Sequence, residues 1–410
     1  MKGVRLVSFL VGAIIIAACG STTTSGGNTN TYAGKVIKLG AILSITGAGG
    51  VYGPQSRDGM NLAVKQINAG GGILGATITL TINDDASLKA TAAQLTQTLI
   101  QGEQDLALLG PTLSNSAVGA HPLAESLKTP ILAVSTTGIH IVPDCNWSAA
   151  TQDTTPCKYV FRDSLGEETA IPDNIKSYAG DKHPATGVLL VAQDDKFSSD
   201  GGQIVQNTVG QYGINLLKVI KFNKAEPDLS PYVTQAVQAK PDVIFITSLG
   251  GIPAKIMTEA RKQGWTGQFL GGNGFNTATV SAQAGADGLG ARSASAWYLG
   301  NTFPSNAEFV SAYRSEYKDA NGNPKDPDQF AAQGYAAINI LADAAKRAGL
   351  TFTDLAGDRD KLRAAMEKVN IQTPLGPFQF TSTHDVKQTV WVIAMDGKGG
   401  FTLVHQIAGS

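Results

Sequence analysis

The stretch that decides the fold is LALLGPTLSNSAVGAHPLAESL, which runs from Leu106 to Leu127. It opens on apolar residues that predict a buried strand, breaks at Gly110-Pro111, and continues as a helix whose start is marked by Ser114 and Asn115. A strand that turns directly into a helix leaves several backbone N–H groups unpaired, at the positive end of the helix dipole. Such an end can hold a carboxylate or a phosphate. The alternative is that Ser114 only caps its own helix.

The N-terminal residues predict export. Lys2 and Arg5 precede an apolar run that ends in Ala17-Ala18-Cys19, and this run is too short to span a bilayer. Residues 1–19 are therefore expected to be a signal peptide. Small residues followed by a cysteine resemble the lipobox of bacterial lipoproteins, which implies cleavage before Cys19 and a lipid on its thiol. The alternative is an ordinary signal peptide with an incidental cysteine. Residues 20–35 are rich in Ser, Thr, Gly and Asn and predict a flexible tether.

Composition limits what the remaining chain can be. The net charge is −1, and it becomes −3 when Lys2 and Arg5 are removed with the signal peptide. Since no basic block is present, a nucleic-acid partner is not expected. The roughly 375 residues that follow the tether are enough for two domains, and no second apolar run approaches the length of a membrane span.

Two further cysteines lie in one polar loop. Cys145 and Cys157 enclose the sequence DCNWSAATQDTTPC, and a close pair of this kind in an exported protein predicts a disulfide. A metal site is the competing interpretation, but neither a histidine nor another cysteine accompanies the pair.

Strands and helices alternate along most of the chain. Apolar strands at 36–43, 77–82, 106–109, 130–134, 187–192, 215–222, 243–247 and 268–271 are separated by amphipathic helices. Repeated units of this length predict an α/β fold with doubly wound parallel sheets, covered by helices on both faces. The final third instead predicts three helices, at 306–318, 328–348 and 359–369, and then short strands. One sheet is therefore expected to be completed by distant segments, which predicts two lobes, more than one crossover and a cleft between them.

Motifs for chemistry are few. Gly70-x-Gly72-x-x-Gly75 matches the dinucleotide-binding pattern, but it precedes a strand, whereas that pattern must follow one. The acidic pairs Asp84-Asp85 and Asp194-Asp195 sit at strand ends, where adjacent carboxylates point to opposite faces. No G-x-S-x-G motif is present, and none of the five histidines has metal-ligand spacing: His121, His140, His183, His384 and His405. Neither a cofactor, a metal nor an enzymatic activity is expected.

Several segments in order carry a family resemblance. They are IKLGAILSITG (37–47), VYGPQSRDGMNLAVKQINAGGGILG (51–75), NDDAS (83–87), GPTLSNSAVGAHPLAE (110–125) and GQFLGGNGF (267–275). Behind a lipobox, this series resembles the solute-binding lipoproteins of ABC importers in the leucine/isoleucine/valine-binding group. The resemblance covers residues 36 to the C-terminus and implies the type I periplasmic-binding-protein fold, in which two lobes close over a ligand.

The resemblance also implies ligand-binding residues. The helix start at Ser114 and Asn115 would hold the ligand's carboxylate, and the strand end at Ser135-Thr136-Thr137 would add a hydroxyl and a carbonyl. Tyr52 matches an aromatic residue that covers the ligand, and Phe197 stands where tyrosine is common. Asn273 is a departure, because amino-acid-binding relatives tend to carry an acidic residue there for the ammonium group, and asparagine has no charge.

The expected organisation follows from these implications. Residues 36–162 and 298–374 should form the first lobe, and 163–297 with 375–410 the second, with hinges near Phe161-Arg162, Trp297-Tyr298-Leu299 and Pro374-Leu375. The expected partners of this monomer are a small polar ligand (an amino acid, amide or organic acid), ABC permease subunits, and the membrane through the lipid on Cys19. The alternatives are a ligand sensor that reports to a membrane receptor and an exported α/β enzyme.

Overall fold

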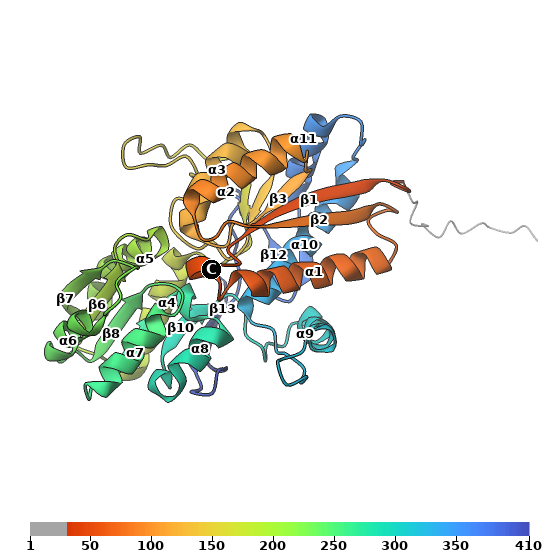
Figure 1. Cartoon of the computed structure of the whole chain (residues 1–410). Coiled ribbons are helices and arrows are strands. Elements are labelled where there is room, and N and C mark those ends of the chain that lie inside the picture. The colour runs from red at the N-terminus through yellow and green to blue at the C-terminus, as the bar shows by residue number, and fades with distance from the viewer. Residues whose placement is uncertain (1–30, 410) are drawn as a thin grey trace, which may run out of the picture.

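Two sheets, each at the centre of one lobe, organise the chain in the computed structural model (Figure 1). The structure describes residues 31–409. The predicted signal peptide and Cys19 lie outside the described residues, as does most of the predicted tether. Among the described residues, no helix is long and apolar enough to cross a membrane.

The sheet of the first lobe is parallel throughout. Its strands follow the order β2-β1-β3-β4-β5 and comprise β1 (Val36–Leu43), β2 (Thr77–Asp84), β3 (Ala107–Leu109), β4 (Ile131–Ala133) and β5 (Val160–Arg162). The three inner strands are almost fully buried, because helices cover both faces. This burial explains why the strands appear in the sequence as continuous apolar runs rather than as alternating patterns.

Helices from both ends of the chain cover this first sheet. They are α1 (Gly53–Ala69), α2 (Lys89–Gln97), α3 (Ser114–Ser126), α9 (Pro304–Glu316), α10 (Gln329–Ala348) and α11 (Leu355–Met366). The late helix α10 packs closely on the early helix α1. A Cβ on Gly59 would lie 2.0 Å from the Ala331 carbonyl oxygen, and one on Gly334 would lie 2.2 Å from the Ser56 carbonyl oxygen. Glycine on each helix therefore permits the contact that closes the first lobe with a distant segment.

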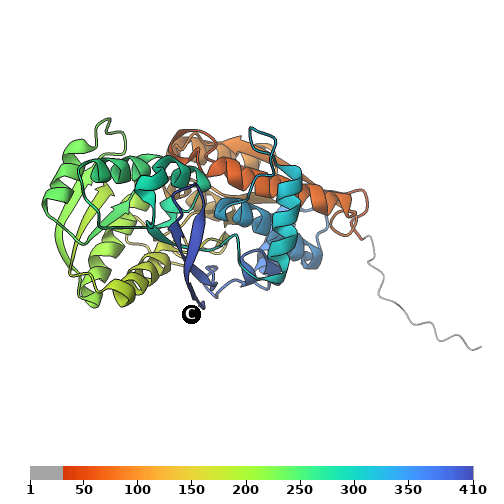
Figure 2. The same ribbon diagram turned by 90° about the horizontal axis from the view of Figure 1, so that it is seen from below.

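The second lobe contains a larger sheet in the order β14-β13-β10-β9-β8-β6-β7. Figure 2 shows the C-terminal strands (dark blue) beside the green elements of this lobe. Its strands are β6 (Thr186–Ala192), β7 (Asn215–Phe222), β8 (Val243–Thr247), β9 (Gln268–Gly271), β10 (Arg292–Ser295), β13 (Val390–Met395) and β14 (Phe401–Ile407). Its helices are α4 (Glu167–Lys182), α5 (Lys196–Thr208), α6 (Ser230–Gln238), α7 (Ile252–Lys262) and α8 (Ala278–Ala284). The strands from β6 to β10 are parallel, whereas β13 and β14 form an antiparallel edge. The two doubly wound α/β lobes that the sequence predicts are thus present.

The chain passes between the lobes after β5, after β10, and before β13. The hairpin of β11 (Asn370–Thr373) and β12 (Gly376–Gln379) precedes the third passage. Leu375 and Phe378, on this hairpin, belong to the hydrophobic core of the first lobe. The expected boundary between residues 374 and 375 falls inside the hairpin, so the boundary lies beyond the hairpin instead.

Cys145 and Cys157 form a disulfide, with their Cα atoms 5.9 Å apart, as their spacing predicts. Both residues are buried against Leu108, Ile131 and Val160 of the first lobe. The loop is therefore tied to one face of the first sheet, and its sulfur atoms are not free thiolates for a metal.

Candidate ligand-binding site

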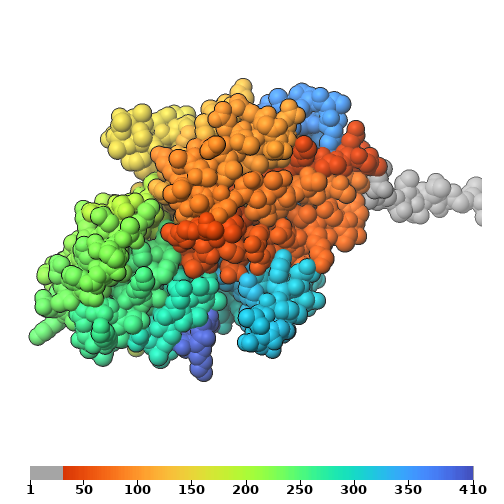
Figure 3. Space-filling view, in the orientation of Figure 1, coloured from red at the N-terminus to blue at the C-terminus, as the bar shows by residue number. Residues whose placement is uncertain are grey.

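A small cavity lies between the two lobes. Its lining residues are Tyr52, Thr112, Leu113, Ser114, Ser135, Phe197, Leu249, Asn273, Gly274 and Phe330. All but Phe330 follow the carboxyl ends of parallel strands, which is where open α/β sheets bind ligands. In the space-filling view, atoms of the first lobe (red to orange) lie directly against those of the second (green) (Figure 3).

Ser114 occupies the first helical position of α3 and not the N-cap that the sequence predicts. The N-cap is Leu113, whose side chain offers no acceptor to the helix start. The Ser114 hydroxyl instead accepts a hydrogen bond of 3.0 Å from the backbone N–H of Gly138. Because it serves another loop, the first N–H groups of α3 keep their capacity for an anion at the cavity wall.

Ser135 lies opposite the second lobe in a backbone conformation that is uncommon for a residue with a side chain. Its φ is +75°, in the left-handed region. Conformations of this kind cost roughly 1–3 kcal/mol and concentrate at binding sites. The Ser135 hydroxyl lies 3.4 Å from that of Ser56, and its carbonyl accepts a bond of 3.3 Å from the Asn273 side-chain amide across the cleft. The strand end is thus held in position from both lobes.

Aromatic side chains close the cavity. The Tyr52 hydroxyl donates to the Gly274 carbonyl at 2.9 Å and accepts from the Gly250 N–H at 3.0 Å, so it joins the first lobe to two loops of the second. Burial raises the pKa of Tyr52, which keeps the hydroxyl protonated. The Tyr52 ring lies 4.9 Å from that of Phe330, and both pack with Phe197 in one apolar cluster. The cavity therefore has a polar wall near Ser114 and an aromatic wall.

Glu167 is a buried carboxyl next to the site. It begins α4, and its Oε1 accepts from the backbone N–H of Asn273 at 2.7 Å and from the Thr137 hydroxyl at 3.3 Å. Its Oε2 has no partner among the described residues. Burial raises the pKa of the Glu167 carboxyl to about 8, although these two donors oppose the shift. At neutral pH this carboxyl is mostly protonated, so a neutral group joins Thr137 to the second lobe.

The structure brings five of the eight predicted ligand-binding residues to the cavity: Tyr52, Ser114, Ser135, Phe197 and Asn273. The other three do not line it. Thr136 donates its hydroxyl to the Pro111 carbonyl, Thr137 donates to Glu167, and Asn115 lies further along α3. The sequence reasoning did not name the other five lining residues: Thr112, Leu113, Leu249, Gly274 and Phe330. Of these, Leu249 and Phe330 lie outside the segments that carry the family resemblance.

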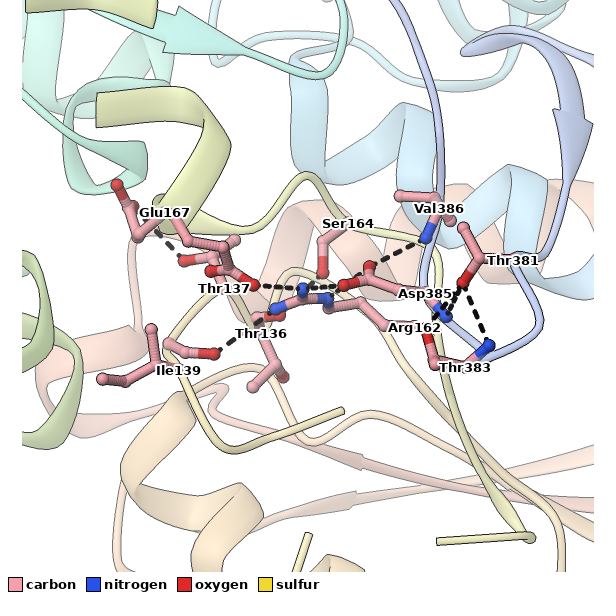
Figure 4. Close-up of polar contacts among 12 residues, drawn as sticks. Thr136, Thr137, Ile139, Arg162, Ser164, Glu167, Thr381, Thr383, Asp385 and Val386 are labelled. Atoms are coloured by element: carbon pink, nitrogen blue, oxygen red, sulfur yellow. Dashed lines mark hydrogen bonds and ion pairs between the residues drawn. The ribbon is translucent and has the colours of Figure 1, made fainter. Parts of the chain in front are cut away.

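Arg162 connects the passages between the lobes at one side of the site (Figure 4). It ends β5, is fully buried, and forms a two-pronged ion pair with Asp385, which lies in the third passage. It also donates to Glu168 of α4 at 2.9 Å and to the Gly138 carbonyl at 3.3 Å. Burial alone would lower the pKa of Arg162, but the two carboxylates reverse the effect and raise it. The guanidinium remains charged and joins segments of both lobes.

These features define a class. A cavity between two α/β lobes, lined by the start of a helix and by aromatic side chains, is the site of a two-lobed solute-binding protein. The chain belongs to the periplasmic binding protein family, whose model matches residues 36–400. Membership places it among binding proteins rather than enzymes and implies an extracytoplasmic location.

Similar proteins support the assignment over nearly the whole chain. The leucine-, isoleucine-, valine-, threonine- and alanine-binding protein of Pseudomonas aeruginosa is 21% identical over 388 residues, which cover 94% of each chain. A leucine-binding protein of Thermotoga maritima superimposes with a TM-score of 0.79 at 22% identity, covering 91% of this chain and 99% of that one. A solute-binding protein of an ABC transporter from Rhodopseudomonas palustris, in complex with benzoate, superimposes with a TM-score of 0.79 at 21% identity. The match covers 91% of this chain and 97% of that one.

Proposed function

We propose that the chain is the solute-binding component of an ABC importer and captures a small carboxylate by closing its two lobes. The observation that carries the proposal is the helix start at Ser114, which lines the cavity between the lobes and has no side-chain cap on its first N–H groups. The ligands named for these relatives are leucine, isoleucine, valine, threonine, alanine and benzoate, which share a carboxylate and, except for threonine, an apolar body. The polar wall of the cavity suits the carboxylate, and the aromatic wall suits the apolar body. A ligand that touches both lobes only when they are shut favours the closed state.

Replacing Ser114 by alanine should weaken carboxylate binding by about tenfold to a hundredfold. The change removes a hydroxyl and leaves the backbone donors, and a lost hydrogen bond to a charged group is worth roughly 1–3 kcal/mol. Calorimetry against a panel of aliphatic and aromatic carboxylates would measure the loss. Ser126→Ala, at the exposed far end of the same helix, is the matched control. A Ser114→Ala variant that binds as tightly as wild type would remove the anion site from the proposal.

We further propose that Cys19 carries a lipid that anchors the protein to the membrane. The support is the sequence Ile16-Ala17-Ala18-Cys19 at the end of an apolar run. Cys19→Ser should therefore move the protein from the membrane fraction to the soluble fraction of its native host. Cell fractionation and immunoblotting would measure this shift. Firm membrane retention of the variant would contradict the anchor.

A further inference from the structure

A chain of three buried side-chain amides leads from the start of α10 to the cavity. Gln329, Asn276 and Asn273 are 3%, 2% and 8% exposed. A side-chain amide has a carbonyl that only accepts and an NH₂ group that only donates, and its orientation must be assigned from its partners. Backbone groups are fixed partners, because their N–H can only donate and their C=O can only accept. They determine which way each of these amides points.

The orientation of Gln329 is set by the backbone N–H of Ala296. This N–H donates to Gln329 Oε1 at 2.8 Å, and the Ser295 hydroxyl donates to the same oxygen at 2.6 Å. The NH₂ group of Gln329 must then point the other way. It donates to Asn273 Oδ1 at 2.5 Å.

Asn276 supports the same orientation from an independent anchor. Its Nδ2 donates to the Ala294 carbonyl at 2.8 Å, which fixes its NH₂ group. The same nitrogen lies 3.2 Å from Gln329 Oε1 and 3.3 Å from Asn273 Oδ1, so both carbonyl oxygens share it as a donor. The carbonyl oxygen of Asn273 therefore faces two donors. Its NH₂ group is left to face the cavity side, where it lies 3.3 Å from the Ser135 carbonyl.

We propose that Gln329 is a specificity-determining positioning residue, which orients Asn273 so that the second-lobe wall of the cavity offers a hydrogen-bond donor. The inference rests on the proposed function, because it concerns the ligand that the same cavity captures. The Asn273 NH₂ group should favour carboxylates whose second polar group is an acceptor, such as 2-oxo acids, over carboxylates that carry an ammonium. An ammonium has three donors and no acceptor, so it cannot accept from the Asn273 NH₂ group, and two sets of donors would face each other at this wall.

Glu167 does not replace the missing acidic partner. Its carboxyl is used by the backbone N–H of Asn273 and by Thr137, and it does not line the cavity. Neither Glu167 nor the Asn273 side chain therefore offers the ligand an acceptor at this wall, and the nearby Ser135 carbonyl already accepts from the Asn273 NH₂ group. The orientation of a single amide decides the polarity of the wall.

Paired ligands that differ only at the second polar group provide the test. Calorimetry should compare leucine with 4-methyl-2-oxopentanoate, and phenylalanine with phenylpyruvate. The wild-type protein should bind the oxo acid of at least one pair more than tenfold more tightly than the amino acid. A wild-type preference for the amino acids would overturn the inference while leaving the proposed function intact. Binding of no carboxylate at all would count against the proposed function itself.

Gln329→Glu tests the positioning role. One carboxylate oxygen can keep the bonds from Ala296 and Ser295, but the other faces Asn273 Oδ1, so the Asn273 amide should turn over and offer an acceptor to the cavity. The ratio of the two dissociation constants in a pair should move at least tenfold toward the amino acid. Gln211→Glu adds the same charge at an exposed position. An unchanged ratio in Gln329→Glu would overturn the role, since a merely structural residue would change both affinities together.

Asn273→Asp provides a second variant that does not depend on Gln329 being replaceable. The carboxylate keeps its bond from Gln329 and presents an oxygen to the cavity in place of the NH₂ group. The affinity for the oxo acids should fall at least tenfold, and the affinity for the amino acids should be unchanged or higher. Equal weakening of both members of each pair would overturn the inference.

Discussion

Replacing Arg162 by methionine should lower the free energy of unfolding by about 3–5 kcal/mol, which is the usual cost of removing one partner from a buried ion pair. The Arg162 side chain is 1% exposed, and those of Asp385 and Glu168 are 23% and 41% exposed. Methionine retains most of the side-chain volume, so the decrease in the free energy of unfolding comes from the lost charge and its hydrogen bonds and not from a new cavity. Chemical denaturation followed by circular dichroism would measure it, and the partial exposure of the carboxylates favours the lower end of the range.

The chain contains a matched exposed pair for comparison. Arg314 and Asp326 form an ion pair with side chains 46% and 53% exposed, and Arg314→Met should cost less than about 1 kcal/mol. The double variant Arg162→Met with Asp385→Leu should recover part of the loss, because an apolar pair can replace a buried ion pair. If Arg162→Met were no more harmful than Arg314→Met, the network that joins the passages between the lobes would not stabilise the fold.

Replacing Glu167 by glutamine should remove a strong pH dependence of stability. In the unfolded chain this carboxyl loses its proton near pH 4.5, whereas burial keeps it protonated in the folded protein up to about pH 8. The folded state binds more protons between these values, so the contribution of Glu167 to stability is complete below pH 4.5 and is lost as the pH rises through 8. A shift of this size corresponds to several kcal/mol.

Urea denaturation of wild type and Glu167→Gln across this pH range would measure the difference. The free energy of unfolding of wild type should fall relative to that of the variant by several kcal/mol from about pH 5 to about pH 8.5. Glutamine keeps an oxygen for the Asn273 N–H and the Thr137 hydroxyl. Glu308→Gln, at an exposed position, controls for the change in net charge. Parallel pH profiles for wild type and Glu167→Gln would show that Glu167 is ionised in the folded protein at neutral pH.

Much of the fold could be predicted because its signals are local. Strands β7, β8 and β9 begin and end where their apolar runs do, and α10 follows the Asp328 cap that precedes it. Strands β5 and β10 were not predicted. Strand β10 has the sequence RSAS, and its buried serines are paired through a polar network formed by distant residues, so no apolar periodicity marks it.

The site could be predicted less completely, for a physical reason. Ser114, Ser135 and Asn273 follow strand ends, and strand ends are visible in the sequence. Gln329 begins a helix and resembles any polar first-turn residue, because its importance comes from the Ala296 N–H of another segment. The structure places Ser114 at the cavity, but as the first residue of α3 and not as its N-cap, and its hydroxyl accepts from the Gly138 N–H.

The Tyr52 hydroxyl has a consequence for how well an importer can tell full molecules from empty ones. Its bonds to Gly250 and Gly274 join the lobes with protein groups alone, so they favour closure whether or not a solute is present. Each such bond reduces the free energy that the solute must supply to shut the lobes, which strengthens capture. The same bond raises the fraction of ligand-free molecules that already adopt the closed conformation. A membrane partner that recognises only this conformation would also bind those ligand-free molecules. One hydroxyl therefore sets a compromise between efficient capture and faithful delivery.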